Sequence, residues 1–415
     1  MASANKRALS LLGLFLLGMA LCNGVLFFGA RHVIASGSTD FMHLYVSGKL
    51  VRTGQGAKLY DGPTQLAAQL PVSAWVRFSN SPYVYLRPAF EAFLFVPFSY
   101  LPLRAAFILW DGINIVILLC IPWILRAELP SFTRLPYIYW AVILFAFFPV
   151  TSVLIQGQDD ILLLLLLALA YLAIAREKMF AAGCWLGLSA FRPQFVLPLL
   201  FILLFAGDSS VLWGFLTVTL LFAALTAILI GWSVLIEYPK YLWWFANVGH
   251  NHHSGDQVFG NAPNIRGLWS GYLSTYLSEN AITVGLVLLS MVTVGIAAVM
   301  MKKWGRTRPE LSFSIALIAA ILVSYHAFAH DLVLLLLPLF LQLEWTTVHN
   351  PSARMMLGLW SAPAILFITP VCYLLVRHAA FNLYSVALLV WVVSASLAVG
   401  MEKAAQGARK SGATV

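Results

Sequence analysis

Charged residues are scarce in this chain of 415 residues. Asp, Glu, Lys and Arg together make up 10% of the sequence, whereas apolar residues make up 61%. A soluble domain averages about 25% charged residues, so too little polar surface is available for an ordinary soluble enzyme. An intrinsically disordered chain is also excluded, because disorder requires low hydrophobicity. The composition therefore indicates a protein that is largely embedded in a membrane.

Cysteine is rare as well. The four cysteines, Cys22, Cys120, Cys184 and Cys372, lie far apart in apolar stretches. This spacing fits neither a disulfide framework nor a zinc motif, and we expect all four to be small core residues. The sequence also lacks a Gly-rich phosphate loop, a nucleophile elbow and a CxxC motif, so soluble nucleotide chemistry has no support. The net charge of +9 is better read as a clue to membrane topology than to nucleic-acid binding.

Long apolar runs are what the sequence does contain. The first, at about 9–28, follows Lys6 and Arg7. It is longer than the apolar part of a signal peptide, which is about 7–15 residues, so we expect an uncleaved helix. Further runs lie at about 103–125, 135–153, 160–175, 210–231, 281–301, 311–325, 331–344, 356–375 and 379–400.

The segment 179–206 is interrupted by Pro193 and Pro198. We interpret it as a hairpin of two short helices with Arg192 at its tip, because most basic residues of the short loops then lie inside, as the positive-inside rule requires. The pattern predicts an all-α bundle of about twelve transmembrane helices over residues 1–415. Both termini, including the basic tail 401–415, then lie in the cytoplasm.

Two long loops, 30–102 and 232–280, are placed outside by this topology. In the first, the apolar piece Pro88–Tyr100 is too short to cross a membrane, and we expect a helix that lies in the interface or re-enters it. The second contains His250, His252, His253 and Asp256, which are more typical of a solvated loop than of a metal site. An aromatic run, Tyr238 to Phe245, precedes them and is either an interfacial anchor or a surface for sugar stacking.

Polar residues gather on the outer side of this topology. A proton or ion path needs polar groups at mid-depth, whereas a site that faces the outer leaflet needs groups at one interface. The distribution favours chemistry on a lipid head group over transport. The candidates are Asp40, Tyr45, Arg87, Gln158, Arg192, Gln194, Arg266, His326 and His330.

Asp40 is the first acid after the first helix. Its carboxylate is suited to accept a proton from a hydroxyl group, although an aspartate before a helix also serves as an N-cap. Arg192 is suited to clamp a phosphate bidentately or, alternatively, to snorkel toward lipid head groups. The pair Asp159 and Asp160 precedes an apolar run, and we interpret it as a structural N-cap.

His326 and His330 are four residues apart, so on a helix they would share one face. One or both are suited to donate to a phosphate or a diphosphate. Asp331 suggests two alternatives: a third metal ligand, for which no fixed motif is present, or a helix cap.

Several short segments occur in an order that a known family also shows. They are Thr39-Asp40-Phe41, Tyr85-Leu86-Arg87-Pro88, Gln156-Gly157-Gln158, Arg192-Pro193-Gln194 and Ser324-Tyr325-His326 with His330-Asp331-Leu332. Over residues 39–340 this ordered set resembles glycosyltransferase family 87. Members of that family are membrane enzymes of the GT-C fold that use polyprenyl-phosphate sugars, typically polyprenyl-phosphate mannose.

The resemblance implies an inverting, single-displacement transfer at an outward-facing site of a bacterial inner membrane. Asp40 matches the acid expected to act as base on the acceptor hydroxyl. Arg192 matches a basic position before a proline, and His326 and His330 fall in the region expected near the donor phosphate. The implied partners are a polyprenyl-phosphate sugar, a glycan or glycolipid acceptor and membrane lipids.

The chemistry of such a transfer agrees with these residues. A lipid phosphate is already a leaving group, so we expect no nucleotide, metal or other cofactor. Arg87, Arg192 and Arg266 are suited to stabilise charge on the departing phosphate. A lipid flippase or other transporter is the alternative, and it would show repeated halves with broken helices at the midplane; a non-catalytic scaffold would not explain the one-sided polar residues.

Overall fold

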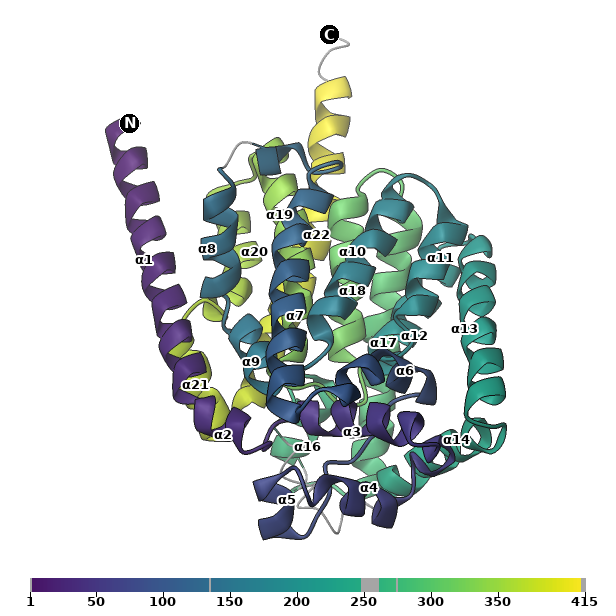
Figure 1. Ribbon diagram of the computed structural model, residues 1–415. Helices are drawn as coiled ribbons and strands as arrows, with labels where there is room; N and C mark the ends of the chain where they lie inside the picture. Colours follow the sequence, from purple (N-terminus) through teal and green to yellow (C-terminus); the bar gives the residue numbers. More distant parts are fainter. Residues whose placement is uncertain (1, 134–135, 248–260, 274, 412–415) are drawn as a thin grey trace.

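The chain folds into helices, and the described residues contain no strand, which confirms the all-α prediction. A computed structural model describes residues 2–133, 136–247, 261–273 and 275–411, with the backbone alone for 2–9, 246–247 and 401–411. Long helices run side by side in a bundle, and short helices gather at one end of it (Figure 1). The chain is an integral membrane protein, because its long helices are apolar enough to cross a bilayer.

Six helical segments of the described chain are long and apolar enough to span a membrane: Ser10–Ala35, Leu103–Leu125, Ser210–Leu229, Glu279–Trp304, Asp331–His349 and Phe381–Gly400. They correspond to α1 (Ala2–Gly29) with α2 (Arg31–Ala35), α7 (Leu103–Leu125), α13 (Ser210–Leu229), α17 (Glu279–Trp304), η6 (Asp331–Leu335) with α19 (Leu336–His349), and η7 (Phe381–Leu383) with α22 (Tyr384–Ser411).

Two further apolar segments are broken by a sharp bend. The axes of α8 (Tyr137–Ala146) and α9 (Phe148–Gln156) differ by 70°, and those of α20 (Ala353–Ile365) and α21 (Thr369–Arg377) differ by 58°. Each second helix has a proline in its first turn, where the missing N–H is tolerated but a continuous helix across the break is not. Counting each pair as one span gives eight.

Four apolar helices are shorter: α10 (Asp160–Ala175), α11 (Met179–Leu188), α12 (Pro193–Phe205) and α18 (Pro309–Leu322). A straight crossing needs about 20 residues, so the count of twelve crossings stays a prediction. The hairpin is confirmed: α11 and α12 are two short helices, and Arg192 occupies the position directly before α12.

The hairpin is fastened to α13 by a very close helix contact. A Cβ atom built on Gly183 would lie 2.0 Å from the carbonyl oxygen of Val211, and one on Gly214 would lie 2.0 Å from that of Phe180. Small residues let two backbones approach in this way. The contact fixes the position of the hairpin and therefore that of Arg192 at its tip.

The first long loop, which the predicted topology places outside and which keeps the name outward loop, is compact. Its helices are α3 (Phe41–Arg52), η1 (Gly56–Lys58), α4 (Gly62–Gln69), α5 (Ala74–Ser79), η2 (Ala89–Glu91), α6 (Ala92–Phe95) and η3 (Pro97–Tyr100). Pro88–Tyr100 does not form the single interfacial or re-entrant helix that was predicted, because it is divided into three short turns. Of these, α6 and η3 pack against α3, and Phe95 and Phe98 are buried. Pro97 interrupts helical hydrogen bonding and separates the last two turns.

The second outward loop contains α14 (Ser233–Asn247) and α16 (Ile265–Leu273). The predicted solvated run with His250, His252, His253 and Asp256 lies outside the described residues. Helix α14 packs on the first loop, where the rings of Tyr238 and Tyr241 lie 5.4 and 5.3 Å from that of Tyr60. The two long loops therefore form one layer across the end of the bundle (Figure 1).

Helix α1 begins, and α22 ends, at the opposite end of the bundle from this layer (Figure 1). This agrees with the prediction that both termini lie on one side. The cysteine prediction is partly wrong: all four are free, but Cys22 and Cys120 are exposed and only Cys372 is buried. The outer face of a membrane bundle contacts lipid, so a small apolar residue is as suitable there as in the core.

Candidate functional site

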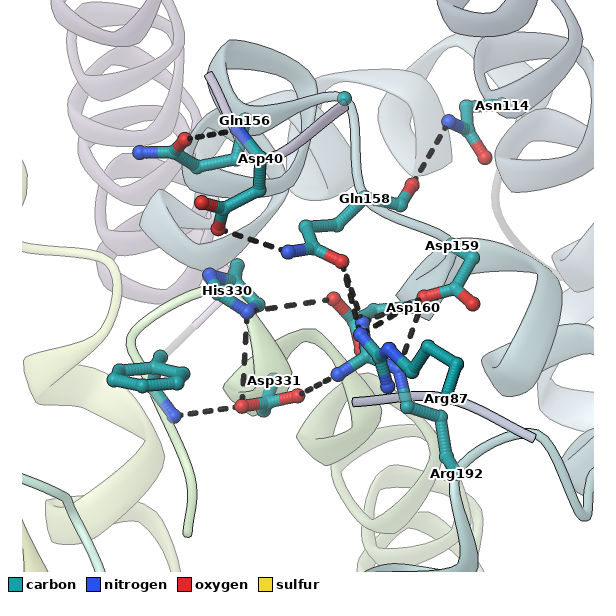
Figure 2. Close-up of polar contacts among 12 residues, drawn as sticks. Asp40, Arg87, Asn114, Gln156, Gln158, Asp159, Asp160, Arg192, His330 and Asp331 are labelled. Carbon is teal, nitrogen blue, oxygen red and sulfur yellow. Dashed lines mark hydrogen bonds and ion pairs between the residues drawn. The ribbon is translucent and has the colours of Figure 1, made fainter. Parts of the chain in front are cut away.

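Four helices begin at one place beneath the outward layer. They are α3, α10, α12 and η6, and the residues at their starts are Asp40, Asp159 with Asp160, Arg192, and Asp331. Figure 2 shows these side chains pointing toward one another. Helix N-termini carry partial positive charge, which favours the carboxylates and disfavours Arg192, so the arginine depends on its acidic neighbours.

A turn at Gly157 positions Gln158 in the middle of this site. Helix α9 ends at Gln156, and Gly157 follows with φ +64°. A Cβ atom there would lie 2.7 Å from the ring of Phe107, so both conformation and space require glycine. The side chain of Asn114 donates to the carbonyl oxygen of Gln158 at 3.2 Å, which holds the turn against α7.

Gln158 connects the acidic and basic parts of the site. Its Nε2 donates to Asp40 Oδ2 at 2.8 Å, and its Oε1 accepts from Arg192 Nη2 at 2.8 Å and from Arg87 Nη2 at 3.2 Å. The amide nitrogen donates to a carboxylate and the amide oxygen accepts from guanidinium groups, and these contacts fix the orientation of the amide. Gln158 therefore sets the position of the Asp40 carboxylate relative to both arginines.

Arg192 is the centre of a buried ion-pair network. Its Nε and Nη2 donate to Asp159 Oδ1 at 2.9 and 2.5 Å, and its Nη1 donates to Asp331 Oδ1 at 2.9 Å. Asp160 Oδ1 lies 3.0 Å from Nη2. Burial alone would lower the pKa of Arg192, but the three carboxylates outweigh it and raise that pKa. Since only 1% of the residue is exposed, Arg192 neither snorkels nor offers an open guanidinium fork.

Asp159 and Asp160 lie at the start of α10 as predicted, but the predicted side-chain cap is not formed. Asp159 occupies the N-cap position of α10, but its side chain accepts no capping hydrogen bond. Both carboxylates turn toward Arg192 instead. A charge-assisted bond to a buried guanidinium is stronger than a bond to a backbone N–H, so the tertiary partner prevails over the local cap.

Asp40 differs from the other acids of the site. Its side chain makes no capping bond to α3, and its backbone N–H donates to Gln156 Oε1 at 3.2 Å. It is half-buried, whereas Asp159, Asp160 and Asp331 are fully buried. Oδ2 accepts from Gln158, and among the described residues no hydrogen-bond donor reaches Oδ1. One oxygen of Asp40 is thus available to a substrate.

Glu91 is a buried acid that sequence reasoning did not select. Burial and the neighbouring Asp159 carboxylate raise its pKa well above the usual range, and the arginines only partly oppose this. Burial would also raise the pKa of Asp159, but Arg192 and Arg87 lower it. The pair therefore shares one proton, which Glu91 carries while Asp159 is ionised. A lone acid within the apolar piece Pro88–Tyr100 was the available signal.

The two candidate histidines lie at the rim of the network. His330 Nε2 is 3.9 Å from Asp160 Oδ2 and 3.7 Å from Asp331 Oδ2. The His326 ring packs near Tyr325 and Phe328. Burial lowers the pKa of His330, and burial with the charges of Arg87 and Arg192 lowers the pKa of His326 to about 3. Both are therefore neutral at pH 7, and each has one N–H to donate.

Asp160, His330 and Asp331 are close enough to hold a metal ion, because one ligand atom from each lies within 4.8 Å of the others. Arg192 lies 3.0 Å from Asp160 Oδ1 and 2.9 Å from Asp331 Oδ1. A metal ion would have to share both carboxylates with this guanidinium, which already neutralises part of their charge.

A family model described as Glycosyltransferase family 87 matches residues 85–338. The matched segment is more than half of the chain and contains Arg87, Gln158, Arg192, His326 and His330. The chain belongs to glycosyltransferase family 87. It is therefore a membrane glycosyltransferase, which acts on a sugar donor and a glycan or lipid acceptor. Neither the curated proteins nor the solved structures give a match.

The other predicted site residues of this family 87 chain lie apart from the network. Arg266, at the start of α16, donates from Nη1 to the carbonyl oxygen of Tyr325 at 3.4 Å and stacks over its ring at 4.5 Å. The hydroxyl of Tyr45 donates to Leu101 at 2.9 Å in the core. Gln194, in the first turn of α12, has a buried Nε2 without a hydrogen-bond partner among the described residues.

An apolar groove of about 1430 Å³, here the membrane groove, begins beside Arg266. Its walls are α12 and α17, and Ser324, Tyr325 and Arg266 line one end. Its other lining residues are mostly apolar and include Leu197, Phe201, Phe205, Val287 and Met291, all of which are exposed. In the family 87 enzyme its lining ends at Tyr325, the residue before His326 in the sequence.

Proposed function

We propose that the enzyme transfers a sugar, most simply mannose, from a polyprenyl-phosphate donor to a lipid-linked or envelope glycan. The observation that carries this proposal is the available oxygen of Asp40 beside a network of two arginines. A hydroxyl that attacks the sugar must lose a proton, and the departing phosphate gains negative charge. Asp40 serves the first need, and the positive charge of Arg87 and Arg192 serves the second.

The transfer is an inverting single displacement. The acceptor oxygen forms a bond to the anomeric carbon while the bond from that carbon to the phosphate oxygen breaks. The hydroxyl proton passes to Asp40 Oδ1, and the electron pair of the broken bond leaves with the polyprenyl phosphate. Asp40 precedes the family-matched residues 85–338, so its role rests on its geometry alone.

The donor phosphate binds near His326, with Arg266 at the mouth of the membrane groove. Neutral His326 and His330 each donate one hydrogen bond to a phosphate oxygen without adding charge. Arg192 acts from behind the network, because its donors already contact Asp159, Asp331 and Gln158. It positions Gln158, which in turn holds Asp40 and contacts Arg87.

The membrane groove supports a lipid-linked donor. A polyprenyl chain is an apolar ligand, and a groove lined by exposed Leu197, Phe201 and Met291 would bury its surface. Arg266 at one end places a cation where the phosphate of such a lipid would begin. A nucleotide-activated donor would leave this groove empty.

The outward layer faces the periplasm or cell exterior of a bacterial inner membrane in this proposal. Supporting this orientation, the basic run Lys302–Arg308 ends α17 away from that layer, as a cytoplasmic loop would. The termini lie at the same end as this run (Figure 1).

A transfer assay tests the function. Purified enzyme in lipid nanodiscs receives radiolabelled polyprenyl-phosphate mannose and a lipid extract of the host. We expect label in a new product, and a loss of about 10²–10⁴-fold in Asp40→Asn. The matched control is Asp208→Asn, because Asp208 caps α13 in the short loop after α12, far from the site.

Three outcomes would contradict the proposal. Near-full turnover by Asp40→Asn removes Asp40 as the base. Label that crosses a vesicle bilayer unchanged points to a flippase. Transfer from a nucleotide sugar, but not from the polyprenyl-phosphate sugar, would show that the donor belongs to a different class.

A further inference from the structure

A second hollow lies on the outward layer, outside the site described above. It has a volume of about 570 Å³ and lies between η1 with the start of α4 and helix α14. We name it the outer groove and define it by its lining residues: Ala57, Lys58, Tyr60, Asp61, Glu237, Lys240, Tyr241 and Trp244. Both elements belong to the long outward loops, so the groove forms only where these loops meet.

Aromatic rings form one side of the outer groove. The rings of Tyr241 and Trp244 are stacked, 5.9 Å apart and 20° from parallel, and Tyr60 lies 5.3 Å from Tyr241. Trp244 is 42% exposed. Its neighbour Trp243 is 69% exposed but does not line the groove. An interfacial anchor needs only exposed rings, and Trp243 provides one; Trp244 instead lines a hollow.

Charged groups of both signs form the rest of the outer groove. Lys58 and Asp61 line the wall formed by η1 and the start of α4, Glu237 and Lys240 line the wall formed by α14, and all four are exposed. Within the described chain no ion pair joins any two of them. Asp61 Oδ2 accepts from the backbone and hydroxyl of Thr64, and these bonds lower the pKa of Asp61. An ionised Oδ1 is left to accept from a ligand.

We propose that the outer groove binds a pyranose ring of a neutral glycan, as a subsite for the part of the acceptor remote from the reacting hydroxyl. A sugar has apolar C–H faces that pack on aromatic rings and hydroxyls that both donate and accept. Two lysines and two acids match such hydroxyls. Because their charges cancel, they favour neither a polyanion nor a cation. This inference rests on the proposed function for its assignment to the acceptor.

Tyr60 links the outer groove to the chemistry. Its ring lines the groove, and its hydroxyl donates to the carbonyl oxygen of Arg87 at 2.8 Å. Arg87 in turn contacts Gln158. A glycan in the outer groove therefore lies one side chain away from the segment that carries Arg87, on the route by which an acceptor from outside would reach Asp40.

Kinetics of two adjacent tryptophan variants test the proposal. We expect Trp244→Ala to raise the KM for the glycan acceptor about tenfold with little change in kcat, because stacking contributes to binding and not to the transition state. Trp243→Ala, the matched control, should leave KM unchanged. Trp244→Phe should restore most of the affinity, since a ring is retained. Equal KM values for Trp244→Ala and the wild type would overturn the proposal.

A binding measurement separates this proposal from the proposed function. Saturation-transfer NMR with free mannotriose should give a signal with the wild-type enzyme in nanodiscs and with Trp243→Ala, and a much weaker one with Trp244→Ala. If no transfer occurs but this pattern is found, the outer groove is a glycan site and the proposed function fails. If transfer occurs and mannotriose binding is equal in all three proteins, the outer groove is not a glycan site and the function stands.

Discussion

Arg192, at the centre of the buried network, and Arg266, at the mouth of the membrane groove, have different surroundings. Arg192 is 1% exposed and contacts Asp159, Asp160 and Asp331 at 2.5–3.0 Å. Arg266 is half-buried and rests on the ring and carbonyl of Tyr325. The first is held in place by the protein, and the second is accessible to a ligand. Two arginines near the membrane surface can therefore have different roles.

The largest expected effect follows from removing the buried arginine. Arg192→Met leaves Asp159, Asp160 and Asp331 buried without their shared cation, and breaking a buried ion pair costs about 3–5 kcal/mol. We expect a large drop in thermal unfolding midpoint and no activity. Arg266→Met should change unfolding by no more than about 0.5 kcal/mol but raise the KM for the donor.

Both variants can be measured by thermal unfolding in nanodiscs and by donor titration. Arg192→Lys separates charge from geometry, because lysine keeps the charge but lacks the planar fork, and it should lie between the wild type and Arg192→Met in stability. If Arg266→Met destabilised the protein as much as Arg192→Met, the distinction between the two regions would be wrong.

A smaller effect, on the pH dependence of stability, tests the protonation of Glu91 in the buried network. The pKa of Glu91 is raised above its ordinary value of 4.5. The stability that the Glu91 proton contributes is therefore complete below pH 4.5 and is lost as pH rises through the raised pKa. Glu91→Gln keeps the shape and cannot ionise, so its unfolding midpoint should fall less at alkaline pH than that of the wild type.

The control for Glu91 is Glu128→Gln, because Glu128 forms a partly exposed ion pair with Arg176 at 2.7 Å far from the network. This variant should follow the wild-type pH dependence. Identical alkaline losses in Glu91→Gln and the wild type would mean that Glu91 does not carry the shared proton.

The smallest expected effect is that of metal removal. Asp160, His330 and Asp331 can approach a metal ion, but Arg192 already contacts one oxygen of each carboxylate. EDTA should therefore change the transfer rate by less than about twofold, as expected when the removed group contributes little to the free energy. A strong loss that is restored by Mg²⁺ or Mn²⁺ would assign the three residues as a metal site.

Much of the site could be predicted from the sequence because membrane topology sorts polar residues by side. The positive-inside rule placed Asp40, Arg87, Gln158 and Arg192 on one face, and the structure brings these four into one hydrogen-bonded network. The short hairpin with Arg192 at its tip was also predictable, since two prolines interrupt the apolar run.

The partners of these residues were not predictable from the sequence. Local rules assigned Asp159 to a cap and Asp331 to a cap or a metal ligand, because capping depends only on near neighbours. Their actual partner, Arg192, is 33 residues from Asp159 and 139 from Asp331. Tyr45 is an opposite case: its position near Asp40 in the sequence suggested a substrate contact, but its hydroxyl bonds to Leu101 in the core.

The separation between Arg192 and Asp331 also means that the buried network is completed late in synthesis. The guanidinium and its first two carboxylates leave the ribosome early, but the third is made only at residue 331 of 415. Until then Arg192 Nη1 has no acceptor at its final place. A chain that ends before residue 331 therefore lacks one of the three carboxylates that hold Arg192.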